Sequence, residues 1–173
     1  MFKSSACAAL ALAFLALGAA PGALAQAVVD EPEWVESQAP PPPAFDMRNL
    51  VIMDMPYTTS LVYGVDPSAI SISKSDGVVR YVMVATSASG AKNAMYEGLR
   101  CATGEFKTYA RYVGDGPWKP VADPQWRSVF GNMPSKHALQ FARTAACDGA
   151  APATTVNGVI ARLKNPNYRT STN

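Results

Sequence analysis

The chain has few of the side chains from which catalytic and metal centres are built. It contains one histidine, His137, and three cysteines in 173 residues. A zinc site takes several histidine, cysteine or acidic ligands, so one isolated histidine argues against a metal. The stretch Gly114–Trp118, GDGPW, lacks the lysine and the following helix of a phosphate-binding loop. The sequence therefore predicts neither a metal nor another cofactor.

Strong charge is also missing. The chain has 15 basic and 13 acidic residues, a net charge of +2, and no basic run dense enough to indicate nucleic-acid binding. Residues 26–47 carry acidic side chains and no base, whereas the chain from Arg48 onward is modestly basic. A basic domain favours anionic partners. We therefore expect an anionic ligand or a partner protein, and no nucleic acid.

The N-terminal residues have the layout of a secretory signal peptide. Lys3 precedes an apolar run from Ala8 to Ala20, which Pro21 and Gly22 end, and Ala23–Ala25 supplies the small residues of a cleavage site. The run is shorter than the roughly 20 residues that span a bilayer. We expect cleavage after Ala25, a periplasmic product and no membrane span in the mature chain.

The mature chain divides by composition. Residues 26–44 contain the run DEPEWVESQAPPPP, and proline lacks the N–H donor that a helix or sheet interior needs. These residues are predicted to form an acidic, proline-rich, solvated tether, either a spacer or a docking peptide. Residues 45–165 are predicted to form a single domain, and 166–173 a polar tail.

Strand patterns precede helix patterns in the predicted domain. Short β-branched and aromatic runs predict strands at 61–63, 70–73, 78–86, 95–101 and 106–113. Apolar spacing predicts helices from Lys136, after Ser135 as cap, to Cys147, and from Thr154 or Thr155 to Asn165. This order predicts an α+β fold, an antiparallel meander with two C-terminal helices on one face.

The register of the last hairpin follows from the face that must be buried. If the loop is Ala102–Glu105, then Cys101 lies opposite Phe106, and one face is mostly apolar while the other is mostly charged. The apolar face then holds Met95, Glu97, Leu99, Cys101, Phe106, Thr108, Ala110 and Tyr112, and the charged face holds Tyr96, Arg100, Lys107, Tyr109 and Arg111.

Glu97 is the notable carboxylate, because this register sets it among apolar side chains. A buried carboxylate needs a cation or several hydrogen-bond donors. We expect a structural pair with Arg80 or Arg143, or an edge position that reaches water. The alternative is a general acid or base.

Cys101 and Cys147 are the two cysteines left once Cys7 leaves with the signal. An even number of cysteines in an exported chain favours a disulfide. Cys101 lies on the apolar face, and Cys147 ends a helix that must pack there. We predict that they pair.

Other candidate residues are few. His137 is predicted to lie at the surface. The alternative is a catalytic Ser-His-Asp arrangement with Ser135 or Ser128 and an aspartate. The segment 114–134 is predicted to be a long loop that packs its own aromatic residues. Its Trp118, Trp126 and Arg127, near Tyr109, are the predicted binding surface; the alternative is that both indoles cover the small core.

The segments RYVMVATSASGAKNAMYEGLRCATGEFKTYA and WKPVADPQWRSV, followed by a cysteine on a C-terminal helix, resemble the cryptic-neisserial-protein-like family. These are small exported proteins of Gram-negative bacteria. The resemblance implies a periplasmic or cell-envelope location and implies no activity or site residues.

Three functions remain open. The favoured one is a soluble periplasmic interaction or ligand-binding module without catalysis. The second is an envelope hydrolase that uses Glu97 or His137, and the third is a structural envelope protein held by the tether. A cleft lined by Glu97 and His137 together is the feature that favours the hydrolase.

Overall fold

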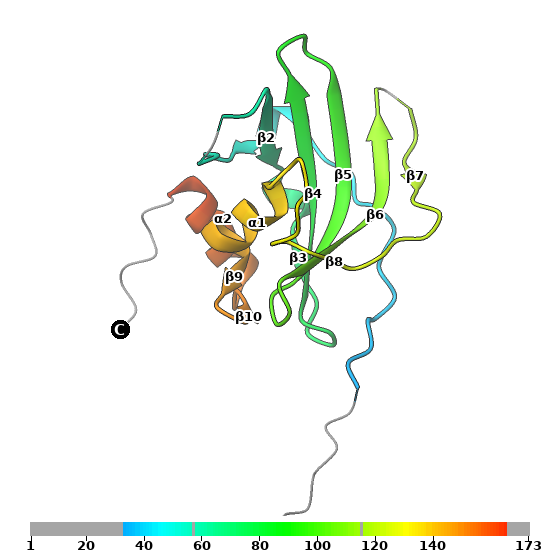
Figure 1. Cartoon of the computed structure of the whole chain (residues 1–173), viewed down its shortest axis with the longest axis vertical. Helices are drawn as coiled ribbons and strands as arrows, with labels where there is room; N and C mark the ends of the chain where they lie inside the picture. The colour runs from blue at the N-terminus through cyan, green and yellow to red at the C-terminus, as the bar shows by residue number, and fades with distance from the viewer. Residues whose placement is uncertain (1–32, 57, 115, 166–173) are drawn as a thin grey trace, which may run out of the picture. The chain divides into compact units, whose positions relative to one another are not determined.

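The computed structural model describes residues 33–56, 58–114 and 116–165 (Figure 1). The predicted signal peptide with Cys7, the first part of the predicted tether and the predicted polar tail lie outside these residues. From Trp34 onward the chain forms one compact unit.

An antiparallel sheet forms the centre of this unit. Its strand order is β1-β2-β4-β5-β6-β7, with β3 beside β4 and β8 beside β6. This confirms the predicted α+β fold, an antiparallel meander with two helices. The strands are β1 (Val51–Ile52), β2 (Leu61–Val65), β3 (Ser71–Ile72), β4 (Val78–Ser87), β5 (Lys92–Arg100), β6 (Glu105–Val113), β7 (Lys119–Pro120) and β8 (Arg127–Ser128).

The remaining elements are short. They are the 3-10 turns η1 (Met47–Asn49) and η2 (Pro67–Ala69), helix α1 (His137–Phe141) continued by the π-helical turn η3 (Ala142–Ala146), the two-stranded ribbon β9 (Cys147–Asp148) and β10 (Ala151–Pro152), and helix α2 (Val156–Lys164).

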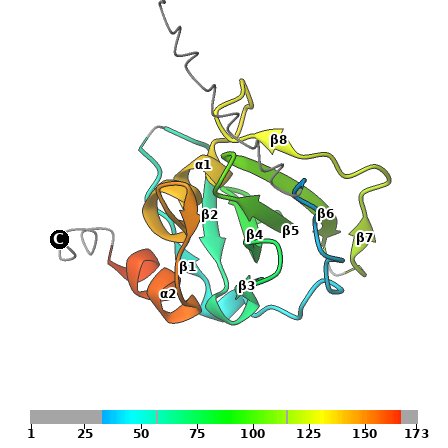
Figure 2. The same cartoon turned by 90° about the horizontal axis from the view of Figure 1, so that it is seen from below.

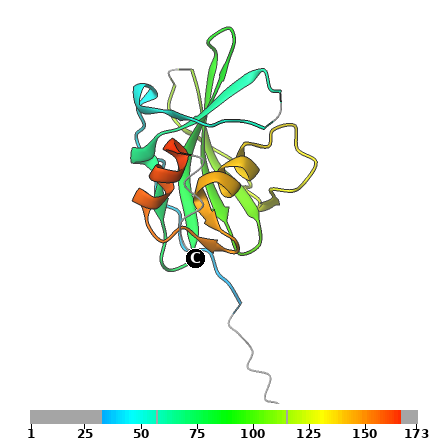
Figure 3. The same cartoon turned by 90° about the vertical axis from the view of Figure 1, so that its left-hand side faces the viewer.

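Both helices cover the same face of the sheet, as Figure 3 shows. Phe141 of α1 packs on Tyr81 of β4 with ring centroids 4.3 Å apart. Val159 and Leu163 of α2 are buried in the same core. The hydroxyl of Thr155 caps α2 by accepting from the amide of Gly158 at 3.0 Å.

The other face of the sheet is also covered, so the predicted half-buried sheet is wrong. Val82, Val84 and Tyr96 are buried there beneath Phe45 and Trp118. Figure 2 shows the N-terminal segment on the opposite side of the sheet from the helices. The mostly apolar run of β4, in which Arg80 is the one charged residue, is typical of a strand buried on both faces.

The β5–β6 register differs from the predicted one by a shift and a bulge. Leu99, not Cys101, lies opposite Phe106, and the ladder is irregular between Tyr96 and Glu97. The extra residue of a bulge reverses which side chains share a face. Beyond it, Ala110 and Tyr112 lie on the second face, and Arg111 pairs with Met95 on the helix face.

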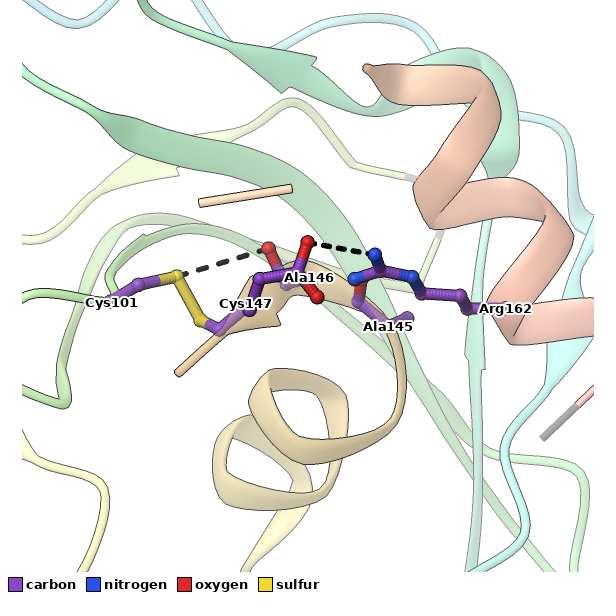
Figure 4. Close-up of a disulfide and its surroundings, with 6 residues drawn as sticks. Cys101, Ala145, Ala146, Cys147 and Arg162 are labelled. Carbon is purple, nitrogen blue, oxygen red and sulfur yellow. Dashed lines mark hydrogen bonds and ion pairs between the residues drawn. A yellow bond between two sulfur atoms is a disulfide. The ribbon is translucent and has the colours of Figure 1, made fainter. Parts of the chain in front are cut away.

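The predicted disulfide is present and ties the hairpin to the helices. Cys101 and Cys147 are bonded, with Cα atoms 5.7 Å apart and a sequence separation of 46. Figure 4 shows this bond beside the carbonyls of Ala145 and Ala146. Arg162 of α2 donates to the carbonyl of Ala145 at 3.4 Å, so the two helical segments are also linked to each other.

The disulfide predicts a large stability effect. Replacing Cys101 and Cys147 together by serine opens a loop of this length, which is expected to lower the free energy of unfolding by up to about 4 kcal/mol. Urea denaturation measures the change, and the reduced wild-type chain should match the variant. Equal midpoints for the oxidised wild type and the variant would show that the bond does not stabilise the fold.

Candidate functional site

Glu97 is the most completely buried carboxylate on the helix face. Its side chain is 1% exposed. The hydroxyls of Tyr81 and Thr108 donate to it at 3.0 and 3.1 Å, and Nε2 of His137 lies 2.9 Å away. A carboxylate with three such partners is satisfied without water.

The predicted arginine partners of Glu97 are wrong. Tyr81 and Glu97 are directly paired across β4 and β5, so they share a face, and the next residue, Arg80, points to the other one. Arg80 binds Asp76 there at 2.8 Å. Arg143 is exposed.

His137 is buried, so its predicted surface position is wrong. The first turn of α1 faces the sheet, and the imidazole stacks on Tyr63 with centroids 5.4 Å apart and meets Phe106 edge-on at 5.9 Å. A carboxylate only accepts hydrogen bonds, so Nε2 donates to Glu97 and a neutral ring accepts at Nδ1 from the Ser135 hydroxyl, 2.6 Å away. Both ring nitrogens are engaged.

A cleft of about 100 Å³ opens above this pair. Its inner wall contains Glu97, Thr108 and His137, and two exposed arginines, Arg111 and Arg127, stand at its edge. Within the described part of the chain, neither arginine has an ion pair or a side-chain hydrogen bond. The rest of the lining is Met95, Phe106, Val121, Asp123, Pro124, Gln125 and Met133.

The predicted binding residues are distributed over different places. Arg127 lies at the cleft. Trp118 packs edge-on against Phe45 at 5.7 Å and belongs to the apolar cluster of the second face. Trp126 donates to Glu36 at 3.1 Å. The two indoles therefore pack on the N-terminal segment and on the second face, not on each other as predicted for the loop.

Glu36 lies in the segment that was predicted to be a solvated tether, and its contacts show that this prediction is wrong for residues 34–37. Lys107 pairs with its carboxylate at 2.5 Å, and the Tyr109 hydroxyl donates at 2.7 Å. Gly98 makes room for Tyr109, because a Cβ at Gly98 would lie 2.2 Å from the tyrosine hydroxyl. Burial raises the pKa of Glu36, but the hydrogen bonds from Lys107 and Tyr109 outweigh burial and lower it below 4.5.

Ser135, His137 and Glu97 follow the hydroxyl–imidazole–carboxylate order of a hydrolase triad. The Ser135 hydroxyl also accepts from the backbone amide of His137 at 3.4 Å, and Ser135 does not line the cleft. These contacts engage the hydroxyl locally, beside the start of α1; the N-cap of this helix is Lys136, not Ser135 as predicted. Both ring nitrogens of His137 are engaged inside the protein, and three of the roughly four acceptor positions of the Glu97 carboxylate are occupied.

Two further features bear on the kind of site. Over the described residues, no cluster of three or more histidine, cysteine or acidic side chains is placed to hold a metal ion. Within the same ranges, no helix has the length and hydrophobicity needed to cross a bilayer.

The chain belongs to the CNP1-like family, whose model matches residues 29–164. This is the family that the hairpin and tryptophan motifs indicated. No curated protein and no solved structure matches the chain.

Replacing Glu97 by glutamine is expected to destabilise the fold. The amide keeps the shape but turns a donor toward one of three donors, which costs about 1–3 kcal/mol. Thermal unfolding measures the loss. Glu105→Gln is the matched control, since Glu105 is partly exposed, and should change little. An unchanged melting temperature for Glu97→Gln would contradict the hydrogen-bond network.

The lowered pKa of Glu36 predicts a pH-dependent contribution to stability. A carboxylate with a depressed pKa stabilises the fold above its unfolded-state pKa and loses that effect as pH falls. The free energy of unfolding should therefore differ between wild type and Glu36→Gln at neutral pH, and the difference should shrink below about pH 4.5. Urea titrations at several pH values test this, with the exposed Glu33 replaced by glutamine as control. A difference that grows on acidification would contradict the lowered pKa of Glu36.

Proposed function

We propose that the chain is a non-catalytic binding module of the bacterial cell envelope that holds an anionic group at the cleft above Glu97 and His137. The observation that carries this proposal is the pair of arginines at the cleft edge. Arg111 and Arg127 have exposed side chains with no counter-ion among the described residues. Guanidinium groups bind carboxylates and phosphates through two parallel hydrogen bonds.

The arrangement of the inner wall supports binding over turnover. Nε2 and Nδ1 of His137 are both engaged, and Glu97 has three partners. A general acid or base needs a proton or a lone pair directed at the substrate. His137 has neither to offer without breaking a hydrogen bond, whereas the three donors leave one acceptor position of the Glu97 carboxylate unused.

A hydrolase is the second candidate, and one observation favours it. Glu97 and His137 line the same cleft, which is the arrangement that a catalytic use of either residue requires. The purely structural role has less support, because residues 34–37 of the predicted tether dock on the chain's own sheet.

The proposed location is the periplasm. The apolar N-terminal run and its small-residue cleavage site support export. The Cys101–Cys147 bond supports an oxidising compartment.

Charge reversal at the cleft tests the proposal. The chain is titrated with inorganic phosphate and with short dicarboxylates, and amide shifts of the cleft residues are followed by NMR. Arg127→Glu and Arg111→Glu should each weaken binding about tenfold or more, because a charge-assisted contact is worth about 1.5–3 kcal/mol. Both variants should keep the wild-type melting temperature.

Lys74→Glu, an exposed charge reversal in the turn before β4 and away from the cleft lining, is the matched control and should bind like the wild type. Binding that survives both arginine changes would exclude this cleft as the anion site. Ester or peptide hydrolysis that disappears in His137→Ala but not in Lys74→Glu would favour the hydrolase.

A further inference from the structure

Residues 34–37, WVES, lie on the second face of the sheet as a peptide lies on a receptor. We call them the arm. The side chains that hold the arm form the arm groove, which consists of Arg80, Arg100, Lys107, Tyr109 and Trp126. The arm joins no strand, so these side chains, together with Asp76, hold it in place of a backbone ladder.

The first anchor is Trp34. The guanidinium of Arg100 lies 3.8 Å from the centre of its ring, a close cation–π contact. Its indole N–H donates to the backbone carbonyl of Asp76 at 2.8 Å, and its ring meets Trp126 edge-on with centroids 5.8 Å apart.

The second anchor is Glu36, which satisfies the cationic part of the groove. Arg80 lies 3.7 Å from the Glu36 carboxylate, besides the Lys107 and Tyr109 contacts described above. The side chains of Arg80 and Lys107 are only 3% and 14% exposed. These exposures are those with the arm in place, and Glu36 is then the carboxylate that pairs with Lys107, whereas Arg80 also has Asp76.

Ser37 completes the recognition. Its backbone amide donates to the Asp76 carboxylate at 2.9 Å, and its carbonyl accepts from Arg80 at 3.2 Å. After it, Pro40–Pro43 form a connector without N–H groups, which is stiff and extended in the manner of polyproline chains. The arm is thus a short ligand that the groove binds through the arm's own indole, carboxylate and serine. A rigid connector joins it to the rest of the chain.

We propose that the arm groove also accepts the arm of a second copy of this chain, so that two copies exchange residues 34–37. The contacts in the exchanged dimer are those in the monomer, and exchange of an identical element is therefore a low-cost route to association. The connector holds the chain's own arm next to the groove, so that this arm competes with the arm of a second copy. Exchange is accordingly a property of concentrated protein.

A pair of engineered cysteines detects the exchange. The hydroxyl oxygens of Ser37 and Ser73 lie 3.5 Å apart, so Ser37→Cys on one chain can reach Ser73→Cys on another only when the arm has crossed over. The two single variants, each with Cys7→Ser, are mixed, unfolded in urea with the native disulfide intact, refolded together at high concentration and oxidised. Mass spectrometry of the non-reduced product should find a disulfide that joins position 37 of one chain to position 73 of the other.

Three controls make the result decisive. Both changes in one chain should give the same link within that chain, which shows that the variants fold and that the geometry permits the bond. Ser89→Cys, on an exposed turn, replaces Ser73→Cys to measure random collision. Adding Lys107→Glu to the Ser73→Cys chain should lower the yield to this collision level, because it repels Glu36.

The proposal is overturned if the link forms within the double variant but the mixture yields no more inter-chain product than the Ser89→Cys control. It is also overturned if Lys107→Glu leaves the inter-chain yield unchanged, because the arm groove would then not be what holds the crossed arm. Neither outcome bears on the arginines of the cleft, so this test is independent of the proposed function.

Discussion

Strand β4 has to be shielded from water on both faces, and the rest of the structure follows from that constraint. Its residues Val78–Ala85 are all buried. A strand of that kind is stable only when other parts of the chain cover both faces of its sheet. The C-terminal helices and the disulfide supply one cover. The N-terminal segment and the loop that carries Trp118 and Trp126 supply the other. The N-terminal and C-terminal parts of the described chain therefore have the same structural role, because each covers one face of the sheet.

The two covers differ in how they treat buried charge. On the helix face, the Glu97 carboxylate accepts hydrogen bonds from two hydroxyls and an imidazole. On the second face, the Asp76 side chain is shielded from solvent and is held by Arg80 and Ser37. Burial raises the pKa of Asp76, yet these hydrogen bonds bring it below its ordinary value. One network consists of two hydroxyls and an imidazole and borders a cleft, while the other contains an arginine–carboxylate pair and is covered by the chain itself.

Much of this fold was predictable from local pattern. The strands around 78–86, 95–101 and 106–113 and both helices follow from β-branched runs and apolar spacing, and the disulfide follows from an even cysteine count. The β-bulge was not predictable, because nothing in YEGLRCATGEFKTYA distinguishes an extra residue at Tyr109 from a regular ladder. This one bulge moves Arg111 to the cleft. The burial of His137 depended on which way a helix of five residues faces.

The candidate site was less predictable than the fold. Docking of residues 34–37 depends on Trp34 and Glu36 meeting Arg100, Lys107 and Trp126, far away in sequence, and an acidic proline-rich composition hides those anchors. One signal was available in the sequence. A tryptophan and four acidic residues just before four prolines are unusual in a mere spacer, since a large aromatic ring gains stability only by being covered.

Because the chain is synthesised from its N-terminus, the arm is made before its binding site. Glu36 leaves the ribosome early, whereas Trp126, which completes its carboxylate's set of partners, follows 90 residues later. At typical synthesis rates that interval is about 5–18 s. The arm therefore spends its first seconds as a nascent peptide whose binding site has not been synthesised, and the second face cannot close before Trp126 has been made.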